Sequence, residues 1–145
     1  MEDTFDLKRF ITAQNAVYAD VLGELKSGHK QTHWMWFIFP QVAGLGHSPT
    51  AKHYAIQSRA EAEAYYAHPV LGLRLNECTR TVLDFDKSAS QIFGYPDDLK
   101  FRSCMTLFEA ISGHPLFAAA LNRFFDGEDK ATREILAGWD SSAGR

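Results

Sequence analysis

Apolar side chains recur every three or four residues between positions 7 and 25. This spacing gathers them on one stripe of an amphipathic helix, which we expect to span about residues 6–27. Asp3 or Thr4 is placed to cap its first turn, and Gly28 lies where a left-handed residue would end it. The chain is therefore predicted to begin with one long helix.

The same periodicity, together with capping residues, predicts helices along most of the remaining chain. Their expected spans are about 49–57, 58–67, 69–85, 88–93, 98–112, 115–125 and 129–137, followed by a frayed tail over 138–145. The run from His33 to Pro40 has no period, so it is either a buried strand-like segment or a helix buried on all sides. Because strand signals are scarce, we predict a compact all-α bundle of about six to eight helices without a substantial sheet. We expect it to be a single domain over 1–145, with its core at about 5–137.

Composition agrees with one soluble domain. The chain has 145 residues, of which 46% are hydrophobic and 23% are charged, and these values exclude a chain that is disordered throughout. Its apolar runs are far shorter than the roughly 20 residues of a membrane span, and its acidic N-terminus is unlike a signal peptide. We therefore expect a cytoplasmic protein that does not bind membranes. The formal net charge of −3 argues against binding of nucleic acid over the whole surface.

Positive charge is concentrated in residues 25–60, which contain no Asp and no Glu. Lys26, Lys30, Lys52 and Arg59 give this segment a charge of +4, although the chain as a whole is acidic. A local positive field in an acidic protein favours an anionic ligand. Chance clustering of bases on a solvated face is the alternative.

A glycine-rich loop in this segment, GLGHSP at positions 44–49, precedes a predicted helix. Glycines allow backbone N–H groups to face a bound anion, and the start of a helix adds further unpaired N–H donors. The loop is therefore a candidate seat for phosphate or carboxylate, with Gly44, Gly46 and Ser48 as its contacts. It is neither a Walker loop nor a dinucleotide fingerprint, and a tight turn with an ordinary N-cap would also explain it.

Signals for ring stacking and nucleophilic catalysis are weaker. Trp34, Trp36 and Tyr54 can offer ring faces to a base or can be core residues, and one Trp can serve in each role. Ser103 follows Lys100 by three residues, which puts both on one helix face and permits a Ser–Lys pair. A lone helical Ser at this spacing from Lys is usually incidental.

A metal site is not indicated. The chain has six histidines, but no carboxylate or thiol completes a ligand set near the four that lie in residues 25–60, and HExxH and CxxC motifs are absent. Cys78 and Cys104 are expected to be reduced, half-buried thiols. Asp97 and Asp98 precede a predicted helix, where they are helix caps or acids that orient a ligand. We predict no metal and no cofactor.

Four sequence blocks resemble one protein family. They are HWMWFIFPQ at 33–41, GLGxS at 44–48, HPVLGxRL at 68–75 and DDxKxxSxMTLF at 97–108. Through them the chain is similar, over about residues 7–136, to an uncharacterised bacterial family, the domain of unknown function numbered eighteen-ten. The resemblance implies a mainly helical domain and supplies no function; the label calpastatin, which some members carry, does not fit, because calpastatin repeats are disordered inhibitors. Cys104 stands where the family more often has Ser, which puts the polar contact at that position in doubt.

The matching blocks mix apolar residues with many polar ones. A polar group that is buried without a partner destabilises a fold by roughly 1–3 kcal/mol, so a pocket lined by convergent polar groups would explain them. These polar residues are His33, Gln41, Ser48, His68, Arg74, Asp97, Lys100, Ser103 and Thr106.

The leading hypothesis is a helical domain that binds a small anionic ligand, phosphate-bearing and nucleotide-like, in a polar and aromatic pocket. The glycine-rich loop would receive the phosphate, and the aromatic residues would stack a ring. Lys52, Arg74 and Lys100 would neutralise the charge of the ligand.

Three alternatives stay open at this point. The first is nucleic-acid binding through residues 25–60, against which the net charge argues. An enzyme built on the same pocket would use His33, His68 or Asp97 as acid or base to hydrolyse a glycosidic or phosphate bond. A protein-interaction or homo-oligomeric module without catalysis is the alternative from a different class.

Overall fold

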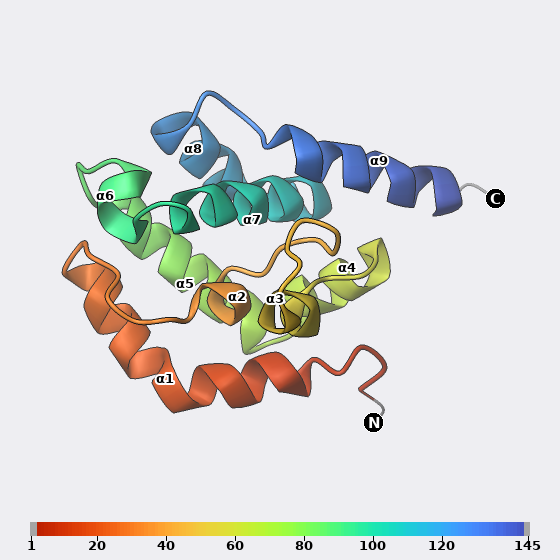
Figure 1. Cartoon of the computed structure of the whole chain (residues 1–145), viewed down its shortest axis with the longest axis horizontal. Helices are drawn as coiled ribbons and strands as arrows, with labels where there is room; N and C mark the ends of the chain where they lie inside the picture. Colours follow the sequence, from red (N-terminus) through yellow and green to blue (C-terminus); the bar gives the residue numbers. More distant parts are fainter. Residues whose placement is uncertain (1–2, 144–145) are drawn as a thin grey trace.

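The computed structural model describes the backbone of residues 3–143 and the side chains of residues 3–139. Within these residues the chain forms nine α-helices and one isolated β-bridge, so the predicted all-α fold is confirmed, with one helix more than the predicted range (Figure 1). The helices are α1 Lys8–Lys26, α2 Met35–Ile38, α3 Pro49–Tyr54, α4 Arg59–Ala67, α5 Leu71–Leu83, α6 Ala89–Phe93, α7 Asp97–Ser112, α8 Pro115–Phe124 and α9 Lys130–Ala143.

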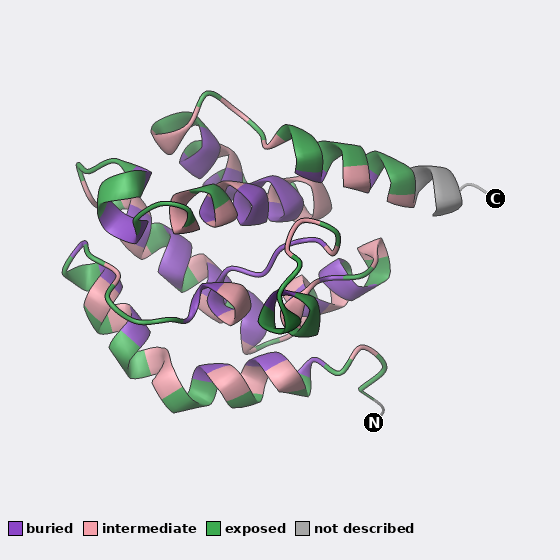
Figure 2. Ribbon diagram, viewed as in Figure 1, coloured by how far each residue is buried: buried purple, intermediate pink, exposed green. Residues whose placement is uncertain are grey.

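Helix α7 is the centre of the bundle. It packs against α2, α4, α6, α8 and α9, while α1 packs against α2 and α5 on the other side (Figure 1). Figure 2 shows that buried residues concentrate on α5 and α7. In the core the ring of Phe101 meets that of Phe39 edge-on at 5.0 Å between centroids and stacks on that of Phe93 at 4.7 Å. These aromatic contacts join α6 and α7 to the segment that follows α2.

The long first helix begins and ends as its flanking residues predict. The Asp3 carboxylate accepts hydrogen bonds from the backbone N–H of Leu7 at 2.7 Å and of Lys8 at 2.9 Å, which satisfies two of the free donors at the start of α1. Those hydrogen bonds lower the pKa of Asp3. At the other end Gly28 adopts a φ of 76°, the left-handed conformation expected after a helix.

The aperiodic run His33–Pro40 contains only a single helical turn, α2. The chain then extends, and Val42 forms a parallel bridge with Ile56. In this bridge the N–H of Ile56 donates to the carbonyl of Gln41, and the N–H of Ala43 donates to that of Ile56, both at 2.8 Å. The bridge explains why the helix predicted for 49–57 ends at Tyr54, since Ile56 is extended and fully buried.

The last helix is longer than predicted. Helix α9 continues to Ala143, where the sequence analysis expected a frayed tail from residue 138; residues 144–145 lie outside the described part of the chain. Leu136 is buried, and Ile135 and Trp139 are partly buried against the core. Their spacing along one helix face explains why the helix extends past Ala137.

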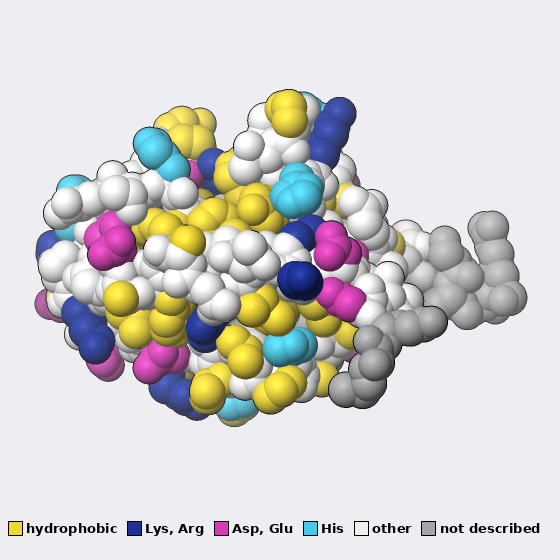
Figure 3. Space-filling model, turned by 90° about the horizontal axis from the view of Figure 1, so that it is seen from below, with side chains coloured by type: hydrophobic (Ala, Val, Ile, Leu, Met, Phe, Trp, Pro, Cys, Tyr) yellow, Lys and Arg dark blue, Asp and Glu magenta, His cyan; other side chains and the backbone are white. Residues whose placement is uncertain are grey.

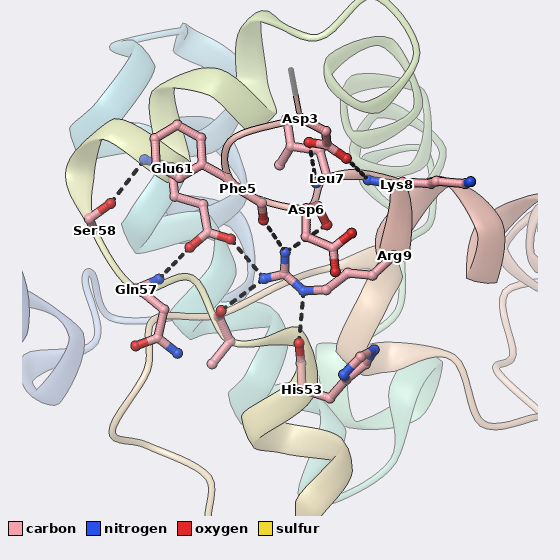
Figure 4. A network of polar contacts seen from close by, with 11 residues as sticks. Asp3, Phe5, Asp6, Leu7, Lys8, Arg9, His53, Gln57, Ser58 and Glu61 are labelled. Atoms are coloured by element: carbon pink, nitrogen blue, oxygen red, sulfur yellow. Dashed lines mark hydrogen bonds and ion pairs between the residues drawn. The ribbon is translucent and has the colours of Figure 1, made fainter. Parts of the chain in front are cut away.

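A buried ion pair joins α1 to α4 (Figure 4). The guanidinium of Arg9 in α1 contacts the carboxylate of Glu61 in α4 at 2.7 Å, and both side chains are largely buried. Arg9 also donates to the carbonyls of His53, in the last turn of α3, and Ala55, which follows that helix. Two more carbonyls, those of Phe5 and Asp6, accept from its Nη1. All three nitrogens of this side chain are therefore used within the fold.

None of the helices in the described residues is long and apolar enough to cross a membrane. On the face shown in Figure 3, Lys and Arg side chains are scattered among acidic and uncharged ones and form no continuous basic surface among the residues drawn in colour.

Candidate functional site

A cleft of about 250 Å³ opens beside the N-terminal half of α7. Trp36 of α2 and the loop at 41–46 form one wall, and α7 and the start of α9 form the others. Leu45, Pro96, Leu99 and Ala131 contribute apolar surface. Five residues proposed from the sequence line this cleft: Trp36, Gln41, Gly46, Lys100 and Ser103.

Lys100 carries the positive charge of the cleft. Its ammonium group lies 4.1 Å from the centroid of the Trp36 ring and 2.9 Å from Oδ1 of Asp97, three residues earlier on α7. The other carboxylate oxygen of Asp97 contacts the ammonium group of Lys30 at 2.8 Å, and only 7% of the Lys30 side chain is exposed. Two ammonium groups therefore share one carboxylate, and this three-residue group has one net positive charge.

The same contacts fix the ionisation of Asp97. Partial burial alone would raise its pKa, but hydrogen bonds and charge interactions with Lys30 and Lys100 outweigh burial and hold the pKa below its usual value. Asp97 therefore remains a carboxylate at neutral pH. Its two oxygens contact one lysine each.

Gln41 lines the cleft and carries a buried donor without a partner in the described part of the chain. Its residue is 7% exposed, and its Nε2 atom is buried with no acceptor among the described residues. Besides the cleft it lines a neighbouring small cavity of about 10 Å³. The backbone carbonyl of Gln41 accepts from Ile56, so the bridge holds this residue in place. A buried donor that lacks an acceptor is destabilising by roughly 1–3 kcal/mol, which makes this amide a candidate ligand contact.

The far side of the cleft is formed by Ser103 and Asp129. The Asp129 carboxylate accepts at Oδ2 from the Ser103 hydroxyl at 3.3 Å, from the Thr132 N–H at 3.0 Å and from the Thr132 hydroxyl at 2.7 Å. The bond from the Thr132 N–H is the N-cap predicted at this position. Thr106 lies behind this group, since its hydroxyl accepts from the backbone N–H of Asp129 at 2.9 Å and donates to the carbonyl of Arg102.

The glycine-rich loop has the geometry of an ordinary turn and cap. The hydroxyl of Ser48 accepts from the backbone N–H of Ala51 at 3.1 Å, and the helix that follows has only six residues. Gly46 is needed for packing, because a Cβ atom there would lie 2.6 Å from that of Ala51 and 3.2 Å from the Trp36 ring. Gly44 has a φ of 105°. Of the three predicted contacts in the loop, only Gly46 lines the cleft.

The aromatic candidates have separate environments. Trp34 is 1% exposed and donates from Nε1 to Glu24 at 3.0 Å, so its ring belongs to the core. Tyr54 is half-buried and packs against Phe10 and Phe37. Trp36 alone of the three lines the cleft with Lys100.

Two of the proposed cations lie elsewhere. Arg74 in α5 donates to the side chains of Gln14 at 3.3 Å and Asn15 at 2.9 Å, both on α1. Its guanidinium also lies over the ring of Tyr18. Lys52 is exposed on α3 and lines an open groove beside Arg9. Neither residue lines the cleft.

The three acid–base candidates do not meet in the cleft. His33 is exposed just before α2. The Nδ1 atom of His68 accepts from the backbone N–H groups of Val70 at 3.1 Å and Leu71 at 3.4 Å, which is a capping role at the start of α5. His114 caps α8 in the same way, through Leu116. The His-Pro dipeptides are thus helix starts, as their sequence context indicates.

The two cysteines are fully buried, where the sequence analysis expected half-buried thiols. Burial raises the pKa of Cys78 to about 12 and that of Cys104 well above its usual value. Both therefore remain protonated at neutral pH, and neither is an activated nucleophile. No group of His, Cys, Asp and Glu with the geometry of a metal site occurs in the part of the chain that the structure describes.

Sequence reasoning missed the role of Asp129 at the cleft. Asp129 caps α9, and a helix cap has no sequence signal that distinguishes one at a cleft from one in solvent. The sequence places Leu99 in a predicted helix and Pro96 just before it. Their place in the cleft depends on how α7 packs against the loop at 41–46.

The Glu24 carboxylate holds residues 31–34, just before α2, through hydrogen bonds that depend on its ionisation. It accepts from the N–H groups of Gln31 at 2.6 Å and Thr32 at 2.9 Å, and also from the Thr32 hydroxyl and from Trp34. Burial opposes ionisation, but these hydrogen bonds prevail and lower the pKa of Glu24 to about 2, from 4.5.

We expect Glu24→Gln to lower the free energy of unfolding by roughly 1–3 kcal/mol at neutral pH. Because the folded pKa is lowered, the contribution of Glu24 is complete above pH 4.5 and is lost as the pH falls toward 2. Urea unfolding at a series of pH values should show the difference between wild type and variant shrinking over this range. Glu63→Gln, an exposed change on α4, is the control, and a difference independent of pH would contradict the assignment.

Comparison with known proteins places the chain in a family without an assigned activity. A family model described as "Protein of unknown function (DUF1810)" matches residues 4–136. The crystal structure of the conserved hypothetical protein Rv1873 from Mycobacterium tuberculosis is similar, with 50% sequence identity and a TM-score of 0.92. The match covers 93% of this chain and 99% of that one. Among curated proteins, none matches the chain.

Proposed function

Because the chain belongs to the DUF1810 family, which is described only as a protein of unknown function, we propose a function from the cleft itself: the protein binds a small ligand through a phosphate or a similarly compact anionic group. The observation that carries this proposal is that Gln41, whose buried Nε2 donor lacks an acceptor among the described residues, lines the same cleft as Lys100. A phosphate oxygen is an acceptor for the amide and a counter-charge for the ammonium group.

The charge balance around Lys100 supports an anion. If Asp97 contacted Lys100 alone, the pair would be neutral, and an anion would gain little from approaching it. Lys30 supplies the second positive charge from a nearly buried position, so the group keeps one net positive charge beside the cleft. The Lys100 side chain is only 22% exposed, and a partly buried charge attracts an anion more strongly than a fully solvated one.

The proposal is for binding, without hydrolysis. None of His33, His68 and Asp97 lines the cleft, and Asp97 is held ionised by two lysines. The size of the cleft also favours a small ligand, since about 250 Å³ is below the roughly 300–1,000 Å³ of sites for drug-sized molecules. A dinucleotide is therefore disfavoured, and a nucleotide has only Trp36 on which to stack.

Thermal unfolding with inorganic phosphate, propyl phosphate and AMP tests this function. A ligand at about 100 times its Kd should stabilise the fold by about 2.7 kcal/mol, which raises the Tm by roughly 5–10 °C. We expect Lys100→Met to abolish the shift while the protein stays folded, because Asp97 keeps its contact with Lys30. Lys52→Met is the matched control, since Lys52 belongs to the same basic segment but lies outside the cleft.

Two results would overturn the proposal. One is a Tm that does not respond to any of the three ligands. The other is a shift that Lys52→Met abolishes and Lys100→Met leaves intact, which would place an anion site on α3.

A further inference from the structure

The Asp129 side chain places a negative charge in the cleft that also contains the positive charge of Lys100. Asp129 and Lys100 line the same cleft, Asp129 before the start of α9 and Lys100 on α7. Three donors contact the Oδ2 atom of Asp129, whereas its Oδ1 atom accepts no hydrogen bond from the described residues. A carboxylate offers about four acceptor positions. The Oδ1 atom is therefore available to a donor from outside the chain.

A phosphate would not fill that position. Two anionic groups in contact repel each other, and the dianion of a phosphate ester, like a carboxylate, has no hydrogen to donate. The phosphate is therefore directed toward Lys100 and Gln41, and the part of the ligand that reaches Asp129 has to carry a donor. The hydroxyl of Ser103, which donates to Asp129, leaves its own lone pairs for an additional donor at the same place.

We propose that the ligand is a phosphorylated polyol or monosaccharide, whose phosphate contacts Lys100 and Gln41 and whose hydroxyl groups donate to Asp129 and Ser103. This inference rests on the proposed function and adds the chemical class of the ligand. Hydroxyl groups suit this end of the cleft because each can donate to the carboxylate and accept from a neighbouring hydroxyl at once. The volume of about 250 Å³ agrees with a ligand of this size.

A pair of ligands that differ only in their hydroxyl groups tests the inference. Glycerol 3-phosphate and propyl phosphate share the phosphate and the three-carbon chain. Calorimetric titration should give a Kd at least about tenfold lower for glycerol 3-phosphate, since hydrogen bonds to charged groups are the stronger class. Equal affinities would overturn the polyol assignment and leave phosphate binding intact, whereas failure of both ligands to bind would remove the proposed function as well.

The variant Asp129→Asn tests whether this residue causes the preference for glycerol 3-phosphate over propyl phosphate. An Asn side chain can still cap α9 through its carbonyl oxygen, so the fold should persist. We expect the variant to bind glycerol 3-phosphate and propyl phosphate with similar affinity, and the exposed change Asp126→Asn to retain the wild-type preference. A preference that survives Asp129→Asn would overturn the assignment to this residue. If the wild type preferred 3-aminopropyl phosphate to glycerol 3-phosphate, the group that contacts Asp129 would be an amine and not a hydroxyl. That result would overturn the polyol assignment.

Discussion

Replacing Arg9 by Ala is expected to lower the free energy of unfolding by about 3–5 kcal/mol, because the change leaves the Glu61 carboxylate buried without its counter-charge. It also removes the donor from four backbone carbonyls, two before α1 and two at the C-terminal end of α3 (Figure 4). For a domain of this size the Tm should fall by roughly 10 °C. Urea and thermal unfolding measure both quantities.

Lys8→Ala is the matched control for this effect. Lys8 precedes Arg9 in the same helix turn and is exposed, so its removal should change stability by no more than about 0.5 kcal/mol. Similar losses in both variants would mean that the N-terminal turn of α1, and not the buried ion pair, determines the effect.

Gly72→Ala is expected to destabilise the protein by about 3 kcal/mol or more, the upper end for an overpacked core position. A Cβ atom at this position would lie 2.1 Å from the backbone carbonyl oxygen of Tyr66, so α4 and α5 would have to separate. Gly23→Ala should do the opposite. Nothing lies within 4 Å of a Cβ atom at Gly23, and Ala in an exposed helix position stabilises by roughly 0.5–1 kcal/mol relative to Gly.

This pair of glycine variants separates packing from helix propensity. Both positions are helical, so propensity alone predicts a gain in stability for each. A stable Gly72→Ala protein, measured by chemical unfolding beside Gly23→Ala, would contradict the close contact of α4 with α5 that the fold requires.

The helices could be predicted because their signals are local. Ser58 and Ser88 accept from the backbone N–H groups of Glu61 and Gln91, as the capping patterns in the sequence indicate. Where the prediction failed, a distant partner decided the structure. Ile56 is extended, not helical, because it pairs with Gln41 and Val42. No sequence pattern near Ile56 indicates that bridge.

The candidate site was predictable only in part, for the same reason. Residue types and charge segregation selected Trp36, Gln41 and Lys100, which the fold brings to one cleft from α2, the following loop and α7. They also selected Arg74, which instead contacts α1 through Gln14 and Asn15. Whether a cation faces a ligand or a neighbouring helix depends on tertiary packing, and a single sequence does not encode it locally.

One lysine of the basic segment 25–60 affects the cleft through a contact that the sequence does not reveal. Lys30 is nearly buried and contacts Asp97, which lies far along the chain at the start of α7. Its effect on the cleft passes through Asp97 to Lys100. The charge of the basic segment therefore acts on the cleft through one buried ion pair, and its glycine-rich loop contributes Leu45 and Gly46 to the lining.

The measurement that tests the central claim most directly is a titration of the protein with propyl phosphate, followed by nuclear magnetic resonance of the side-chain N–H groups. The account predicts that the side-chain amide signals of Gln41 and the indole N–H signal of Trp36 shift together and saturate, while the indole N–H of Trp34, bound to Glu24 in the core, stays in place. Saturating shifts confined to residues outside the cleft, or no shifts at all, would contradict it.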